Sequence, residues 1–173
     1  MAEAPPPPSP ALPPSRGKGG AFLAYALALL VLVLDQASKH WILFVFDLPA
    51  KGSVPVFGPL NLTMVWNQGV SFGLLRAEVD LVRWALVVFS LIVSVILAVW
   101  AWRTRAAFTL TALGLVIGGA VGNAIDRARF GAVADFIDVS RLYFPWVFNV
   151  ADSAITIGIV ILLLDGLRPR NTP

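Results

Sequence analysis

The sequence predicts an all-α integral membrane protein with four transmembrane helices, plus a small β-structure and a short interfacial helix outside the membrane. Three observations support this fold class. Hydrophobic residues make up 58% and charged residues 13% of the chain, whereas average globular chains contain about 45–50% and about 25%. Apolar runs recur on the scale of the ~20 residues that a helix needs to cross a bilayer. Basic residues collect in the short segments that flank these runs.

The N-terminal part of the chain predicts an extension followed by the first span. Residues 1–20 are rich in Pro, Ser and Gly, a composition that cannot bury apolar area, so we expect them to be disordered. The first apolar run covers Ala21–Phe46 and contains Asp35 and Lys39, which we place near its outer end. A cleaved signal peptide also starts with basic residues and an apolar run, but no convincing small-residue cleavage site follows this one.

Residues 48–75 differ in character from the apolar runs. Gly and Pro recur there, and the stretch Leu60–Asn67 alternates with a period of two residues, which predicts a small β-structure outside the membrane. One face of the expected strand carries Leu60, Leu62, Met64 and Trp66. Residues 76–83 form a short amphipathic piece that we expect to lie along the interface.

Three further apolar runs complete the predicted membrane domain over residues 21–167. They are Trp84–Trp102, Ala106–Ile125 and Val150–Leu164, and Trp at both ends of the first is typical of interfacial anchoring. Residues 126–149 then connect the last two spans outside the membrane, and residues 168–173 form a tail.

The distribution of basic residues predicts the topology. Those that lie densest near the helix ends share one side: Arg16, Lys18, Arg103, Arg105, Arg168 and Arg170. The positive-inside rule therefore places both termini in the cytoplasm and the two long connections outside. The net charge of +3 arises from scattered residues without a dense basic run, which argues against nucleic-acid binding.

Composition also limits the chemistry. The chain contains no cysteine and a single histidine, His40, which excludes disulfides, thiolate sites and a multi-histidine zinc site. We expect no metal and no cofactor. Hydrolysis would rest mainly on carboxylates, hydroxyls, lysine or arginine.

Several charges lie at or near apolar segments, where a charge at the centre of a span costs roughly 2.5–3.5 kcal/mol. Under the predicted topology they gather at the outer ends of the spans, which indicates a site. They are Asp35, Lys39, Asp126, Arg127, Asp135, Asp138 and Asp152.

Asp35 and Lys39 are four residues apart, so they share a helix face in the favourable acid-before-base order. This spacing favours a structural ion pair that positions the helix end. A lysine general base partnering a serine, and a contact with substrate, are the alternatives.

The segment GGAVGNAIDR carries two signals. Glycines recur every four residues from Gly114 to Gly122, which predicts a smooth face for close helix packing. Asn123, Asp126 and Arg127 point one way at the helix end, as either a salt-bridge network or part of a site.

The segments FNVADS and ADFIDV supply further carboxylates. Asn149 fits a helix cap, whereas Asp152 lies inside the apolar run and is better explained by function. Spacing alone does not decide whether Asp126, Asp135 or Asp138 is its partner. Two adjacent carboxylates share one proton, so one can activate water while the other protonates a scissile carbonyl.

Five blocks, in order, resemble those of the lipoprotein signal peptidase (signal peptidase II) family: DQASK from Asp35, NQGVSFG from Asn67, GGAVGNAIDR from Gly118, VADFIDV from Val133 and FNVADS from Phe148. The resemblance implies a catalytic pair at Asp135 and Asp152. It implies substrate-binding roles for Asn67, Asn123, Arg127 and Asn149. Structural support is expected from Asp35, Lys39, Gly122 and Asp126.

The resemblance also implies the substrate and location. The substrate is a prolipoprotein carrying diacylglycerol on a cysteine, cut just before that cysteine, in the bacterial inner membrane near its periplasmic face. The expected partners are this substrate and membrane lipids, with the enzyme a monomer. Residues 48–75 are a candidate substrate platform, and residues 76–83 a candidate lid.

Two other classes of protein are alternatives to a peptidase: one uses buried carboxylates for transport, and the other has no catalytic carboxylates. An ion- or proton-coupled transporter is the main alternative, but the acidic residues gather at one face, the two middle spans are uncharged, and no inverted repeat is visible. A non-catalytic membrane scaffold is the other, and it would tolerate loss of Asp152.

Overall fold

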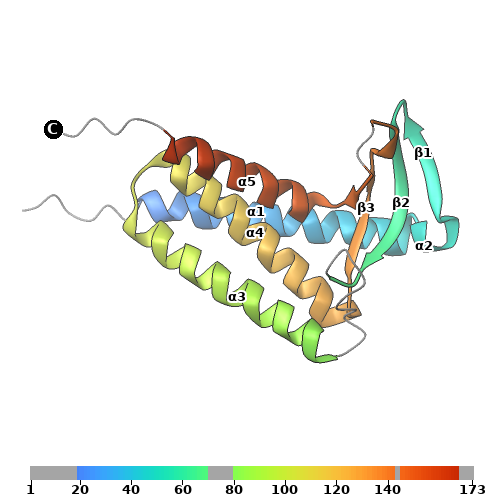
Figure 1. Cartoon of the computed structure of the whole chain (residues 1–173), viewed down its shortest axis with the longest axis horizontal. Coiled ribbons are helices and arrows are strands. Elements are labelled where there is room, and N and C mark those ends of the chain that lie inside the picture. Colours follow the sequence, from blue (N-terminus) through green and yellow to red (C-terminus); the bar gives the residue numbers. More distant parts are fainter. Residues whose placement is uncertain (1–18, 70–79, 143–144, 168–173) are drawn as a thin grey trace, which may run out of the picture.

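The protein is a helix bundle with a small antiparallel sheet across one end (Figure 1). The computed structural model describes residues 19–69, 80–142 and 145–167. Residues 1–18 of the expected disordered head (residues 1–20), half of the expected interfacial piece (residues 76–79) and the tail (residues 168–173) lie outside the described residues. The last two residues of the expected head, Gly19 and Gly20, are helical and begin the first helix.

Among the residues that the structure describes, three helices are long and apolar enough to cross a membrane. They lie within Gly20–Val45, Asp80–Arg103 and Ala107–Phe130. The first consists of α1 (Gly19–His40) and a π-helical turn (Trp41–Val45), and the others are α3 and α4. The remaining apolar helix, α5 (Val150–Gly166), has 17 residues, about 26 Å at 1.5 Å per residue. Length therefore does not establish the predicted fourth span.

Helix α4 occupies the centre of the bundle and packs against α1, α3 and α5. Its glycines allow this close approach. A Cβ atom on Gly114 or Gly118 would lie 2.5 Å from the carbonyl oxygen of Ala24 or Ala28 in α1, and one on Gly119 would lie 2.5 Å from that of Ala151 in α5. The predicted small-residue packing is therefore confirmed, and it explains why α4 is the most buried of the three candidate spans.

The sheet has the strand order β1-β2-β3-β4, and every pair is antiparallel. Strands β1 (Ser53–Phe57) and β2 (Leu60–Asn67), preceded by the short helix α2 (Leu48–Lys51), lie in the region where β-structure was predicted. Strands β3 (Val133–Asp138) and β4 (Val147–Phe148) lie in the connection for which no strands were expected. Both are short: β4 pairs with β3 alone, and β3 also pairs with β2, which is remote in sequence.

The junction of α4 and β3 places the sheet against the helix ends. Helix α4 continues five residues beyond the expected end at Ile125, to Phe130. Gly131 then adopts a left-handed conformation (φ 81°) and its N–H bonds to the carbonyl of Arg127, which is the usual way for a glycine to end a helix. The chain can therefore reverse direction into β3 directly over the last turn of α4.

A small apolar cluster fixes the sheet to the end of α1. Ile42, Leu48 and Phe136 are buried together, with Leu62 and Met64 of β2 packed against them. Phe136 of β3 therefore points toward the end of α1. Its neighbour Asp135 points to the other face of the strand, because successive side chains alternate.

Candidate active site

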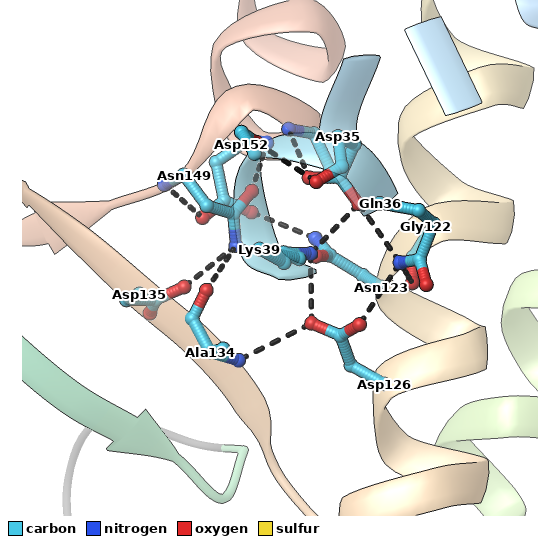
Figure 2. Close-up of polar contacts among 12 residues, drawn as sticks. Asp35, Gln36, Lys39, Gly122, Asn123, Asp126, Ala134, Asp135, Asn149 and Asp152 are labelled. Atoms are coloured by element: carbon cyan, nitrogen blue, oxygen red, sulfur yellow. Dashed lines mark hydrogen bonds and ion pairs between the residues drawn. The ribbon is translucent and has the colours of Figure 1, made fainter. Parts of the chain in front are cut away.

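The first feature of the site is a lysine buried among carboxylates (Figure 2). Lys39 is 2% exposed. Its Nζ lies 2.8 Å from Asp35 Oδ2, 2.8 Å from Asp126 Oδ2 and 3.1 Å from Asn123 Oδ1. An ammonium group has three donors, and all three are engaged here. The predicted ion pair with Asp35 is confirmed, and this saturation argues against the general-base alternative.

Gln36 completes this network, and the sequence analysis did not single it out. Its Nε2 lies 3.2 Å from Asp35 Oδ2, 3.0 Å from Asp126 Oδ1 and 3.3 Å from the carbonyl oxygen of Gly122. Its position inside the DQASK block was the available signal. The backbone N–H of Ala134 donates to Asp126 Oδ2 (3.2 Å), so the network joins α1, α4 and β3.

Asp35 also reaches the start of α5, which explains the glycine at position 122. The backbone N–H of Ala151, one of the unpaired donors of that helix's first turn, bonds to Asp35 Oδ1 (3.0 Å). A Cβ atom on Gly122 would lie 2.5 Å from Asp35 Oδ2. A side chain at position 122 would therefore push Asp35 away from Lys39 and from α5.

We expect Gly122→Ala to lower the melting temperature of the purified protein and to reduce its activity, because the methyl group displaces the Asp35 carboxylate. The matched control is Gly166→Ala, since a Cβ there meets nothing within 4 Å. Thermal unfolding of both variants in the same detergent gives the comparison. Equal melting temperatures for the two variants would contradict the role of this close contact.

Asn149 connects the two carboxylates that were predicted to form the catalytic pair. Its Nδ2 donates to Asp135 Oδ1 (2.7 Å). Its Oδ1 accepts from the backbone N–H of Asp152 (2.9 Å), and its own backbone N–H donates to Asp152 Oδ2 (3.3 Å). This reciprocal pair is a capping box at the start of α5. The cap predicted for Asn149 is thus confirmed, and the same residue bonds to both carboxylates.

Two further amides position the carboxylates. Asn67, at the end of β2, donates from Nδ2 to Asp135 Oδ2 (3.0 Å). Asn123 of α4 donates from Nδ2 to Asp152 Oδ1 (2.8 Å), while its Oδ1 accepts from Lys39. Each carboxylate therefore accepts two N–H bonds. The bond from Lys39 fixes the orientation of one of these donors, the amide of Asn123.

The two carboxylates have different environments. Asp135 is 1% exposed, whereas Asp152 is half-buried. Burial, and secondarily the negative charge of Asp152, raises the pKa of Asp135 from its ordinary value to about 7. At neutral pH a proton can thus reside on this side chain while the pair as a whole stays charged.

Arg127 lies beside the pair on the last turn of α4. Its guanidinium is attracted by Asp152, Asp135 and Asp126. One contact runs from Nη1 to the carbonyl oxygen of Asn123 (3.4 Å), and the buried Nε finds no acceptor in the part of the chain that the structure describes. An unpaired buried donor is costly, so Arg127 is the residue beside the pair whose hydrogen bonding is incomplete among the described residues.

Both carboxylates open into one cavity of about 490 Å³. Polar groups occur at the carboxylate end, and apolar side chains cover much of the remaining wall. The lining residues are Asn67, Asp135, Val139, Trp146, Val147, Phe148, Asp152, Ser153, Thr156 and Ile157.

The two other carboxylates considered as partners of Asp152 have different contacts. Asp126 is held by Lys39, Gln36 and the backbone of Ala134. Asp138 lies outside the network, where it accepts from Thr63 Oγ1 (2.7 Å) and from the backbone N–H of Ser140 (2.9 Å). Odd spacing along a strand puts two side chains on opposite faces, which explains why Asp138 turns away from the site of Asp135.

Arg83 belongs to α3 rather than to a separate interfacial piece. Its Nε and Nη2 donate to the carbonyl oxygens of Arg127 (2.7 Å) and Ala128 (2.8 Å). These carbonyls belong to the last turn of α4, where cations are favoured. Arg83 therefore fixes the end of α4 that carries Asn123 and Arg127. The sequence analysis missed this contact, because no local spacing relates residue 83 to residue 127.

Comparison with known families identifies the family of this chain. The family model described as signal peptidase (SPase) II matches residues 27–168, which include every residue of the network and the cavity. The chain belongs to the signal peptidase II family.

Relatives named lipoprotein signal peptidase match most of the chain. The chain is 53% identical to the lipoprotein signal peptidase of Caulobacter vibrioides over 83% of its own length and 86% of the relative's. It is 48% identical to that of Methylorubrum extorquens, over 86% and 88%. Two solved structures, each described as a bacterial membrane enzyme, are 29% identical to the chain, with TM-scores of 0.72 and 0.73. They cover 87% and 85% of this chain, and the matches span 93% and 94% of theirs.

Proposed function

We propose that this signal peptidase II is an aspartic endopeptidase that removes signal peptides from diacylglyceryl-modified prolipoproteins by cutting before the lipidated cysteine. Asp135 and Asp152 form its catalytic pair. One observation carries the proposal: two carboxylates from separate segments, β3 and α5, line one largely apolar cavity and share Asn149 as a hydrogen-bond partner. The pair can perform hydrolysis with protein groups alone.

The environments of the two carboxylates support distinct roles at the start of the reaction. Asp135, whose pKa is raised to about 7, carries the proton and donates it to the oxygen of the scissile carbonyl. Asp152 accepts a proton from water, and the resulting hydroxide attacks the carbonyl carbon. The proton on Asp152 then passes to the leaving amine as the C–N bond breaks. One hydroxyl of the tetrahedral intermediate returns its proton to Asp135 as the carbonyl re-forms, so that the pair again holds one proton.

The amides and Arg127 provide candidate contacts with the substrate backbone. Asn67, Asn123 and Asn149 hold the carboxylates through donors that stay in place during the reaction. The unpaired Nε–H of Arg127 can donate to a substrate carbonyl. Such fixed donors act without reorganisation when charge develops. Asn123 and Asn149 therefore serve substrate binding through the carboxylates that they hold, while Asn67, which lines the cavity, and Arg127 are the candidates for direct contact with substrate. Asp35, Lys39, Gly122 and Asp126 support these residues.

We place the enzyme in the bacterial inner membrane with α5 as its fourth span. Helix α5 packs along α4, and its outward side chains are apolar and exposed, among them Ile159, Val160 and Leu163. Both termini are then cytoplasmic, and the sheet and cavity lie at the periplasmic face. In this position the acyl chains of the substrate can stay in lipid while the scissile bond reaches the carboxylates. We expect the monomer to act without a metal or cofactor.

The test of the function is cleavage in vitro of a diacylglyceryl-modified precursor and of the same precursor without the lipid. We expect the modified precursor to be cut before its cysteine and the unmodified form to be left intact. Equal cleavage of both forms would contradict the assignment of substrate, and proton flux in liposomes without any peptide would favour a transporter.

The pH dependence of cleavage follows from the pKa of Asp135. Because that pKa is raised to about 7, the proton needed for the carbonyl oxygen is present below pH 7 and is lost above it. We expect kcat/KM for the lipidated precursor to fall on the alkaline side with a midpoint near 7, approaching tenfold per pH unit. A rate that stays level up to pH 9 would contradict the proposed role of this proton.

A further inference from the structure

The turn between β1 and β2 exposes apolar side chains that the proposed chemistry does not use. Phe57 is 82% exposed and Val56 is 54% exposed. Side chains of successive strand residues normally alternate between faces, but the register of β1 against β2 shifts between Pro55 and Phe57. Apolar side chains at a protruding turn are a feature that a water-exposed hairpin normally avoids.

A second segment braces this turn. Arg141 donates from Nη1 to the carbonyl oxygen of Gly58 (3.4 Å). Arg141 and the next residue, Leu142, are exposed, and Leu142 is 60% exposed. Val56, Phe57, Arg141 and Leu142 together are called the hairpin-tip patch below. It combines three apolar side chains with one cation.

The arrangement of the elements places this patch beside the bundle rather than on top of it. The strands run across the end of the helices, and the β1–β2 turn extends past the bundle on the side of α5 (Figure 1). The three candidate spans are apolar along their length, so their ends lie near the membrane surface. A turn that reaches sideways at that level lies over lipid.

We propose that the hairpin-tip patch contacts the interfacial layer of the outer leaflet, with Phe57 and Leu142 among the upper acyl chains and Arg141 at the phosphates. The inference rests on the membrane placement proposed above. Exposed aromatic and aliphatic side chains enter this layer, and basic side chains pair with its phosphates. The contact braces the chain after β3, where Val139 and Val147 line the cavity, so it holds the cavity wall at the surface from which a lipid-bearing substrate arrives.

The absence of native cysteine makes a direct test possible. Phe57→Cys provides one site for a nitroxide spin label on the full-length protein, reconstituted in vesicles of phosphatidylethanolamine and phosphatidylglycerol. Two matched labels calibrate the measurement: Lys51→Cys at the end of α2, just before β1, and Val95→Cys in the middle of α3, both exposed. Power-saturation electron paramagnetic resonance reports collisions with oxygen, which enriches in lipid, and with a nickel chelate, which stays in water.

We expect the label at position 57 to collide with the nickel chelate several-fold less than the label at position 51, and to give an oxygen-to-nickel ratio between those of positions 51 and 95. Leu142→Cys should give the same result, and it replaces Phe57→Cys if that variant does not fold. A label at positions 57 and 142 that behaves like the one at position 51 would overturn the proposal. If the label at position 95 were also water-accessible, the membrane placement itself would fail, which separates the two outcomes.

Discussion

Asp135→Asn and Asp152→Asn should each lower the rate of cleavage of a lipidated precursor by roughly 10²–10⁴-fold, the range that a positioned proton-transfer group contributes. The amide at either position keeps the size of the side chain but removes the shared proton. Both carboxylates accept two N–H bonds, and each variant can retain part of that bonding. We therefore expect both proteins to insert and to bind the precursor while hydrolysis fails. Single-turnover cleavage of purified protein measures the effect.

Asp138→Asn is the matched control for this prediction. Asp138 lies on the same strand as Asp135, three residues along, and bonds to Thr63 and Ser140 away from the cavity. Its replacement should leave cleavage within a few-fold of the unmodified enzyme. Full turnover by Asp135→Asn or Asp152→Asn would remove that residue from the pair, and a loss in Asp138→Asn as large as in Asp135→Asn would point to a different pair.

Lys39→Met should destabilise the folded protein by about 3–5 kcal/mol, the usual cost of removing one partner from a buried charge cluster. Lys39 is the cation that lies between Asp35 and Asp126. Without it, two buried carboxylates face each other across Gln36 and must either repel or take up protons. Because Asp35 also holds the first turn of α5, the loss should reach Asp152. Thermal or denaturant-induced unfolding of the purified protein in mild detergent measures the change.

Two further variants separate this effect from a general loss of positive charge. Lys51→Met removes an exposed lysine and should change stability by less than about 1 kcal/mol. Adding Asp126→Asn to Lys39→Met removes one of the stranded charges and should recover part of the lost stability. If the double variant were as unstable as Lys39→Met, or if Lys51→Met were equally harmful, electrostatic repulsion among buried carboxylates would not explain the result.

The parts of the fold that were predictable are those with local signals. The apolar runs placed α1, α3, α4 and α5 to within a few residues, and the period-two pattern located β2. Four-residue spacing identified the glycines of α4 and the ion pair of Asp35 with Lys39. In each case the physical cause lies within one element: hydrophobic length, strand alternation or the helical repeat.

The parts that were missed depend on contacts between distant segments. Strand β3 has six residues and becomes a strand because β2 and β4 pair with it. Arg83 reaches carbonyl groups 44 and 45 residues away, and Gln36 bonds to α4 from α1. The choice among Asp126, Asp135 and Asp138 also stayed open on spacing alone. Their neighbours in the structure distinguish them. Asp126 contacts Lys39, Asp135 lines the cavity, and Asp138 bonds to Thr63.

The most direct test of the account is a titration of Asp135 in the intact enzyme and in Asp152→Asn. The infrared carbonyl band of a protonated carboxyl group, assigned by its loss in Asp135→Asn, reports this proton. We expect the band to titrate near pH 7 in the intact enzyme, and at a clearly lower pH in Asp152→Asn because a neighbouring negative charge is gone. A band that titrates at the same pH in both proteins would show that the two carboxylates do not interact, and would contradict the catalytic pair.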